Sequence, residues 1–111
     1  MPELPEVEVL TRHLSPALSG KTIRAVSIQR AKSTRPTFAR AMRAKLVGAK
    51  FISVSRRAKY LLFQLKPPRR DLFTLLGHLG MTGRMYVQPV NAALPKHAAV
   101  TFGLGRRTFV F

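Results

Sequence analysis

The first eight residues, Met-Pro-Glu-Leu-Pro-Glu-Val-Glu, combine a proline at position 2 with three of the chain's four carboxylates. Removal of Met1 would leave Pro2 with a free secondary amine; α-amino groups titrate near ~7.7–8, so part of it is unprotonated at neutral pH. Such an amine attacks an aldehyde or a sugar C1′ and forms an iminium. Glu3 and Glu6 could donate or accept protons beside it. The alternative is an ordinary chain start whose acids are only charges at a helix N-terminus. If Met1 is retained, the Pro2 nitrogen is an amide and cannot attack.

A second candidate is the basic run Arg56-Arg57-Ala58-Lys59-Tyr60, which precedes an apolar stretch. Period-two alternation places Lys59 on the same side as Leu61, Phe63 and Leu65, at the end of a strand. There its amine could meet a phosphate or assist proton transfer. The alternative is a basic hairpin turn that keeps a hydrophobic strand soluble.

Gly77-His78-Leu79-Gly80-Met81-Thr82-Gly83 is the third candidate, because its glycines permit a tight turn and close approach to a ligand. Met81 would then lie at a loop tip, where it could wedge into a base stack. His78 could donate to a phosphate or be a satisfied structural histidine. His97, after Lys96, could be a further backbone contact or part of a solvated loop. The histidines and acids show no metal-ligand spacing.

The composition indicates the partner. The 111 residues include 20 Lys+Arg and 4 Asp+Glu, for a net charge of +16 and a pI near 11.9. This predicts a polyanionic partner, of which nucleic acid is the commonest; a basic fragment of a longer, more acidic protein is the alternative. With 46% hydrophobic residues the chain should fold as one domain. It has no cysteine, no signal-peptide pattern and no span-length apolar run, so a cytoplasmic location is expected.

Two helices are expected. Apolar spacing predicts the first over residues 5–14, after which Pro16 should separate a short turn, 15–19, ended by Gly20. The second is expected over 37–46 with Gly48 as its stop. Its basic side chains are expected to form a solvated face; these are Arg40, Arg43 and Lys45.

The remaining sequence reads as short strands separated by turn-like residues. The expected strands are 22–29, 51–55, 60–65, 72–79, 84–87, 100–104 and 108–111. Their spacing predicts an α+β fold that is mainly β, a two-layer antiparallel β-sandwich or barrel flanked by two helices. Because the last expected strand runs to Phe111 without a polar tail, we expect the chain to be the N-terminal piece of a longer protein.

Taken together, these motifs resemble the N-terminal domain of formamidopyrimidine-DNA glycosylase. The resemblance rests on residues 2–8, 56–62, 78–83 and 96–97, which occur in the family's order and approximate spacing, and it covers all 111 residues. Leu4 fits this family better than its endonuclease-VIII branch, which typically has glycine there.

The resemblance implies a base-excision repair enzyme, acting as a monomer on damaged double-stranded DNA, that removes oxidised purines and then nicks the strand. It implies that Pro2 is the Schiff-base nucleophile and Glu3 the proton donor to the sugar. Lys59 would assist β-elimination and hold a phosphate. His78 and His97 would contact the DNA backbone. Met81 would fill the space left in the duplex when the damaged base flips out, and Glu6 would lie near that extruded base.

The sequence also departs from the family. The helix–two-turn–helix unit and the zinc finger that follow this domain are not in the chain, so no cofactor is expected within residues 1–111. Ala98-Ala99 stand where the family often has an acid and a second histidine. A non-catalytic basic nucleic-acid-binding module is therefore the alternative to an enzyme.

Overall fold

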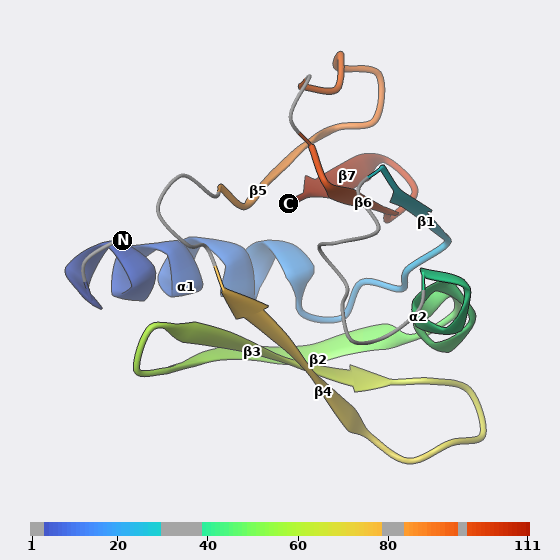
Figure 1. Ribbon diagram of the computed structural model, residues 1–111, viewed down its shortest axis with the longest axis horizontal. Helices are drawn as coiled ribbons and strands as arrows, with labels where there is room; N and C mark the ends of the chain where they lie inside the picture. Colours follow the sequence, from blue (N-terminus) through green and yellow to red (C-terminus); the bar gives the residue numbers. More distant parts are fainter. Residues whose placement is uncertain (1–3, 30–38, 79–83, 96–97) are drawn as a thin grey trace.

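The computed structural model describes residues 4–29, 39–78, 84–95 and 98–111 (Figure 1). Along the chain the elements are α1 (Leu4–Leu18), β1 (Ala25–Ile28), α2 (Ala39–Leu46), β2 (Lys50–Arg57), β3 (Tyr60–Lys66), β4 (Phe73–His78), β5 (Tyr86–Pro89), β6 (Val100–Gly103) and β7 (Arg107–Val110).

The described strands form two antiparallel sheets, one with the order β1-β6-β7-β5 and one with the order β2-β3-β4. With two helices beside them, the fold is mainly β in two layers, as the sequence predicts. Each expected strand is found, with ends that shift by up to three residues. The largest shift is in 22–29, where the ladder with β6 covers only Ala25–Ile28.

Helix α1 is continuous through Pro16, so the prediction of a break after residue 14 is wrong. A proline inside a helix removes one backbone hydrogen bond. Here the last turn is held by other interactions, because Leu14 and Leu18 are buried in the core and the Ser19 amide donates to the Ser15 carbonyl at 2.9 Å. Gly20, at φ +84°, ends the helix as expected.

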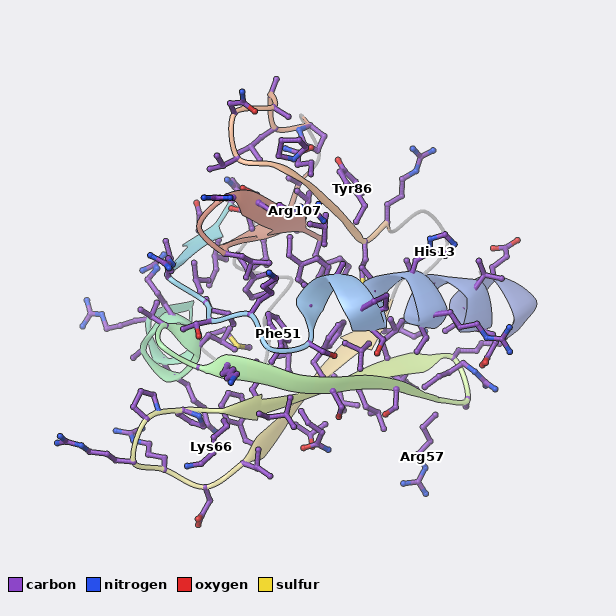
Figure 2. The ribbon with its side chains drawn as sticks, turned by 180° about the vertical axis from the view of Figure 1, so that it is seen from behind. His13, Phe51, Arg57, Lys66, Tyr86 and Arg107 are labelled. Atoms are coloured by element: carbon purple, nitrogen blue, oxygen red, sulfur yellow. The ribbon has the colours of Figure 1, made fainter. Side chains whose placement is uncertain are left out.

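Aromatic side chains join the two sheets. The ring of Phe109 on β7 lies 6.1 Å from that of Phe51 on β2 and 5.7 Å from that of Phe63 on β3. Its own sheet supplies Phe102, stacked on it at 5.3 Å. Figure 2 shows Phe51 between the layers. Along β3, burial of Leu61, Phe63 and Leu65 confirms the expected alternation.

The helices lie against sheet edges. α1 packs along β2 and reaches β5, which are edge strands of different sheets. α2 packs beside edge strand β1, where Arg43 Nε donates to the Val26 carbonyl at 3.1 Å. Lys45 Nζ lies 4.9 Å from the ring centroid of Phe73 on edge strand β4. Arg40, Arg43 and Lys45 are all exposed, as expected for a solvated face. Arg43 and Lys45 also make these contacts, which help cover edges that would otherwise be open to pairing.

Two backbone hydrogen bonds between the turn after α1 and the start of β2 set the direction of β2. The Gly20 amide donates to the Phe51 carbonyl at 2.7 Å, and the Phe51 amide donates to the Lys21 carbonyl at 2.9 Å. β2 therefore starts at the C-terminal end of α1 and runs back along the helix. Its far end, Arg57, is thereby brought to the first turns of α1. Among the described helices, none has the length and apolar character needed to cross a membrane.

Candidate active site

The site predicted from the sequence lies only partly within the described residues. Pro2, Glu3, Met81 and His97 lie outside them. Helix α1 begins at Leu4, directly after the first two of these, and Glu6 is exposed in its first turn. A carboxylate there is favoured by the partial positive charge of a helix N-terminus.

Lys59 lies in the tight turn between β2 and β3. The strands pair up to Arg57 opposite Tyr60, which leaves only Ala58 and Lys59 in the loop. Both are exposed. The expected alternation therefore holds for the strand from Leu61 onward but does not extend to Lys59. The turn instead presents the lysine to solvent.

Ala58 has a φ of +54°, in the left-handed region that non-glycine residues avoid. A residue with a Cβ there costs about 1–2 kcal/mol. The Ala58 carbonyl accepts a hydrogen bond from Arg56 Nη1 at 3.0 Å, which helps hold the strained turn. Backbone strain of this kind persists where surrounding contacts impose it, often at functional sites.

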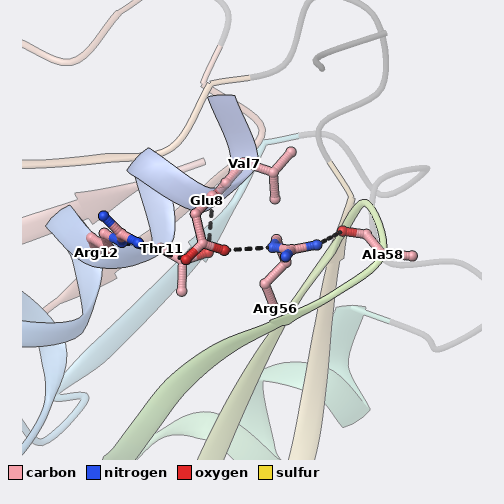
Figure 3. A network of polar contacts seen from close by, with 6 residues as sticks. All are labelled: Val7, Glu8, Thr11, Arg12, Arg56 and Ala58. Atoms are coloured by element: carbon pink, nitrogen blue, oxygen red, sulfur yellow. Dashed lines mark hydrogen bonds and ion pairs between the residues drawn. The ribbon is translucent and has the colours of Figure 1, made fainter. Parts of the chain in front are cut away.

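The same guanidinium contacts helix α1. Arg56 Nε donates to Glu8 Oε2 at 2.7 Å, and Glu8 Oε1 also pairs with Arg12 Nε at 3.3 Å (Figure 3). The Arg56 side chain is 31% exposed and that of Arg12 is 77% exposed, so Arg56 is the more buried partner and makes the shorter contact. The hydrogen bond from Arg56 is the main reason that the pKa of Glu8 lies below its ordinary value of 4.5.

Arg56 therefore connects the first turns of α1 with the hairpin that carries Lys59. Sequence reasoning missed this connection, although it included Glu8 among the acids of the chain start and Arg56 in the basic run. The two residues are 48 positions apart. Only the antiparallel run of β2 along α1 brings them together.

His78 lies at the same end of the sheet. It is the last residue of β4 and pairs across the ladder with Tyr60, the residue after Lys59. The two rings are 4.9 Å apart, and the histidine is exposed. An exposed imidazole next to the hairpin favours the ligand-contact interpretation of His78 over that of a satisfied core histidine.

Gly77 lies within strand β4, in agreement with the strand expected over 72–79, so it serves packing and not the tight turn that the glycines of its motif would permit. It is a buried β4 residue, and a Cβ placed there would lie 2.7 Å from Met85 Cε and 3.0 Å from Phe63 Cε2. Glycine lets these two side chains pack over β4. The sequence signal resembles that of a turn because glycine is common in both settings.

The described residues at this end offer one helix-start carboxylate, a lysine at a hairpin tip and an exposed histidine. Figure 2 shows Arg57 projecting outward from the same hairpin. Such cations suit a phosphate backbone. Among the residues described, no three His, Asp or Glu side chains lie close enough together to hold a metal ion.

Comparison with known proteins identifies relatives over the whole chain. A family model described as the formamidopyrimidine-DNA glycosylase N-terminal domain matches residues 1–111. A formamidopyrimidine-DNA glycosylase of Symbiobacterium thermophilum is 41% identical over 104 residues, which are 94% of this chain and 32% of that protein. One of Novosphingobium aromaticivorans is 40% identical over 106 residues, or 96% of this chain and 37% of that protein. The chain thus spans about a third of the length of these curated relatives.

Solved structures agree. A Lactococcus lactis enzyme of the same name, non-covalently bound to DNA containing an abasic (AP) site, matches with a TM-score of 0.89 at 28% identity. A complex of the L. lactis protein with DNA containing N7-benzyl-Fapy-dG matches with a TM-score of 0.89 at 29% identity. Each match covers 98% of this chain and 39% of the solved chain.

Proposed function

This chain belongs to the formamidopyrimidine-DNA glycosylase N-terminal domain family, and we propose that it carries the catalytic groups of a DNA glycosylase and AP lyase in base-excision repair. The single observation that supports this most strongly is the anchoring of the Lys59 hairpin to the first turns of α1 through Arg56 and Glu8. These contacts hold the hairpin that carries Lys59 against α1, the helix that begins shortly after Pro2.

The proposed substrate is damaged double-stranded DNA that contains an oxidised purine, such as 8-oxoguanine or a formamidopyrimidine. The L. lactis complexes with Fapy-dG-type and AP-site DNA support this substrate class. A net charge of +16 supports binding to the phosphate backbone. We propose that the enzyme acts as a monomer in the bacterial cytoplasm, where chromosomal DNA lies.

In the proposed reaction, the free amine of Pro2 attacks C1′ of the damaged nucleotide after the base has left the stack. The C1′–N bond breaks and the base departs with a proton. Glu3 protonates the sugar ring oxygen, so the ring opens and an iminium joins Pro2 to C1′. Removal of a C2′ proton then expels the 3′ phosphate by β-elimination. Lys59 assists this step and holds a phosphate, while His78 and His97 contact the backbone. Glu6 lies near the lesion and Met81 fills the void.

The test is borohydride trapping on a duplex that carries one abasic site, with the protein in excess at low salt. Borohydride reduces an iminium to a stable covalent adduct. We expect an adduct with Met1-processed protein, a reduced yield with Pro2→Gly, and none with a form that retains Met1 and so has an amide at Pro2.

An adduct that forms equally well with the Met1-retaining form would contradict the role of Pro2. DNA binding without any adduct, in a chimaera that also carries the remainder of the S. thermophilum relative, would favour the non-catalytic nucleic-acid-binding module.

A further inference from the structure

A basic groove lies at the C-terminal end of α1, at the other end of the helix from Glu6 and the Lys59 hairpin. Its volume is about 870 Å³, and it is formed by the end of α1, the segment leading to β1 and the β6–β7 hairpin. Figure 1 shows these segments gathered at the helix end away from the N-terminus. At about 1.5 Å per residue, the two ends of α1 are roughly 22 Å apart. The groove is therefore separate from the candidate active site.

Four cations line the groove: Lys21, Arg24, Arg106 and Arg107. Among the described residues that line it, none is acidic. The ion pairs found within the described part of the chain all use Glu8, with Arg12 or Arg56, and none involves these four cations. Like charges gathered without counter-charges repel one another and attract anions.

Arg24 is built into the groove rather than simply exposed beside it. Its amide donates to the Gly103 carbonyl at 2.7 Å, which holds its backbone to β6. Its guanidinium packs over Gly105, where an added Cβ would lie 3.4 Å from Nε. Gly105 itself has a φ of +97°, so a glycine suits both the turn and the close approach.

The chemistry of the lining favours a phosphodiester chain. Arginine forks match phosphate oxygens in a bidentate manner, and three of the four cations are arginines. A membrane-surface site would place large apolar side chains beside the cations. Here the one large aliphatic side chain of the lining, Leu104, is buried.

We propose that this groove is a second DNA-backbone site, which holds phosphates of a DNA segment beyond the one at the reactive end of α1. The choice of DNA as the polyanion rests on the proposed function, whereas the groove takes no part in the Pro2 chemistry. With DNA bound at both ends of α1, the groove would hold the DNA backbone while the candidate active site at the N-terminal end of the helix contacts successive bases.

The test compares salt dependence of duplex binding, by fluorescence anisotropy, between the 111-residue protein and Arg24→Gln/Arg106→Gln. The matched control, Arg69→Gln/Arg70→Gln, removes the same charge from the exposed β3–β4 loop. If each groove arginine neutralises one phosphate, the slope of log K against log salt falls by about 2 in the groove variant. Doubling the salt then weakens wild-type binding about fourfold more than variant binding. The control should keep the wild-type slope.

Two further variants make the result decisive. Arg24→Lys/Arg106→Lys keeps both charges and should keep the slope, and thermal unfolding followed by circular dichroism checks that all variants fold. Pro2→Gly should give a reduced yield of trapped adduct yet keep the slope, so failure of the proposed chemistry is distinguishable from failure of the groove.

Equal slopes in the groove and control variants would overturn the proposal. So would inorganic phosphate, supplied at constant ionic strength, if it removed the difference between wild type and groove variant, because the site would then hold a small anion. Loss of binding to anionic lipid vesicles in the groove variant, with an unchanged DNA slope, would assign the groove to a membrane surface instead.

Discussion

Arg56 is the residue through which two separate parts of the site are joined. Its guanidinium donates to the Glu8 carboxylate and to the Ala58 carbonyl, so it binds a helix and a turn with one planar group. Arginine suits this task because its donors are fixed in a rigid fork, which lysine lacks. We treat it as a positioning residue, since its partners are within the protein.

Replacing Arg56 should slow the chemistry more than it weakens DNA binding. In Arg56→Gln the strained turn at Ala58 loses its support, and Lys59 moves relative to α1. We expect the rate of strand nicking by β-elimination to fall about 10-fold, since small misplacements of reacting groups are costly. Single-turnover nicking of an abasic-site duplex, with the protein in saturating excess, measures this.

The matched control is Arg12→Gln, which removes the more exposed of the two partners of Glu8. Its rate should stay close to that of the wild type. Equal rate losses in both variants, or a loss explained wholly by weaker DNA binding, would show that Arg56 has no positioning role.

Glu8 makes stability depend on pH in a defined direction. Its pKa is lowered in the folded protein, chiefly by the hydrogen bond from Arg56. The ionised form is therefore favoured by folding. Its contribution is fully present above the ordinary pKa of 4.5 and is lost as the pH falls through the lowered folded value.

Urea unfolding of wild type and Glu8→Gln from neutral pH to below pH 4.5 tests this. We expect the wild type to be the more stable at neutral pH and the difference to shrink in acid. A difference that is constant across the range would mean that the carboxylate charge does not contribute.

At the scale of elements, the end of α1 shows tertiary packing prevailing over a local helix breaker. Pro16 removes one hydrogen bond, but burial of Leu18 beyond it keeps the last turn helical. This last turn is followed by Gly20 and Lys21, whose backbone groups form hydrogen bonds with Phe51 at the start of β2. The helix end therefore sets the direction in which β2 returns to the site.

Pro16→Ala should stabilise the protein, because the amide of residue 16 could then donate within the helix and Pro16 itself is exposed. We expect a gain of about 1 kcal/mol after allowing for the greater freedom of the unfolded chain. Chemical denaturation measures it. Pro68→Ala, at an exposed loop position, gains no helical hydrogen bond and should be neutral or slightly destabilising; an equal gain in both would contradict the explanation.

At the scale of the whole molecule, the Phe109 side chain contributes to packing between the two layers. Phe109 is 1% exposed and packs against rings from both sheets. The charge of +16 works against compactness, so this core must outweigh repulsion across the surface. Loss of the ring should therefore affect both sheets at once.

Phe109→Ala should cost about 3–5 kcal/mol, the range for a large aromatic residue removed from a core. Leu76→Ala is the control, because Leu76 is 63% exposed and its loss should change stability by less than about 0.5 kcal/mol. Thermal unfolding of both variants gives the comparison. A small effect at Phe109 would mean that the two layers are held together elsewhere.

Local patterns were sufficient for much of this protein. Alternation along Leu61–Leu65 and the stops at Gly20 and Gly48 are properties of neighbouring residues, so the strands and both helices could be predicted from the sequence. The types of the candidate reactive groups, an N-terminal proline with acids and a lysine in a basic run, could also be recognised there. Lys59 and His78 are exposed in the structure, and their contacts with a ligand stay predictions.

The tertiary structure alone decided which of these groups meet. The contact of Arg56 with Glu8, the edges covered by Arg43 and Lys45, the packing at Gly77 and the groove around Arg24 all join segments distant in the sequence. Such contacts depend on strand register and on the direction of each element. Neither property appears as a repeating pattern of residue types in the sequence. The periodicity of the sequence indicates which side of a helix or strand is buried. Which other element packs against that side is decided only when the whole chain folds.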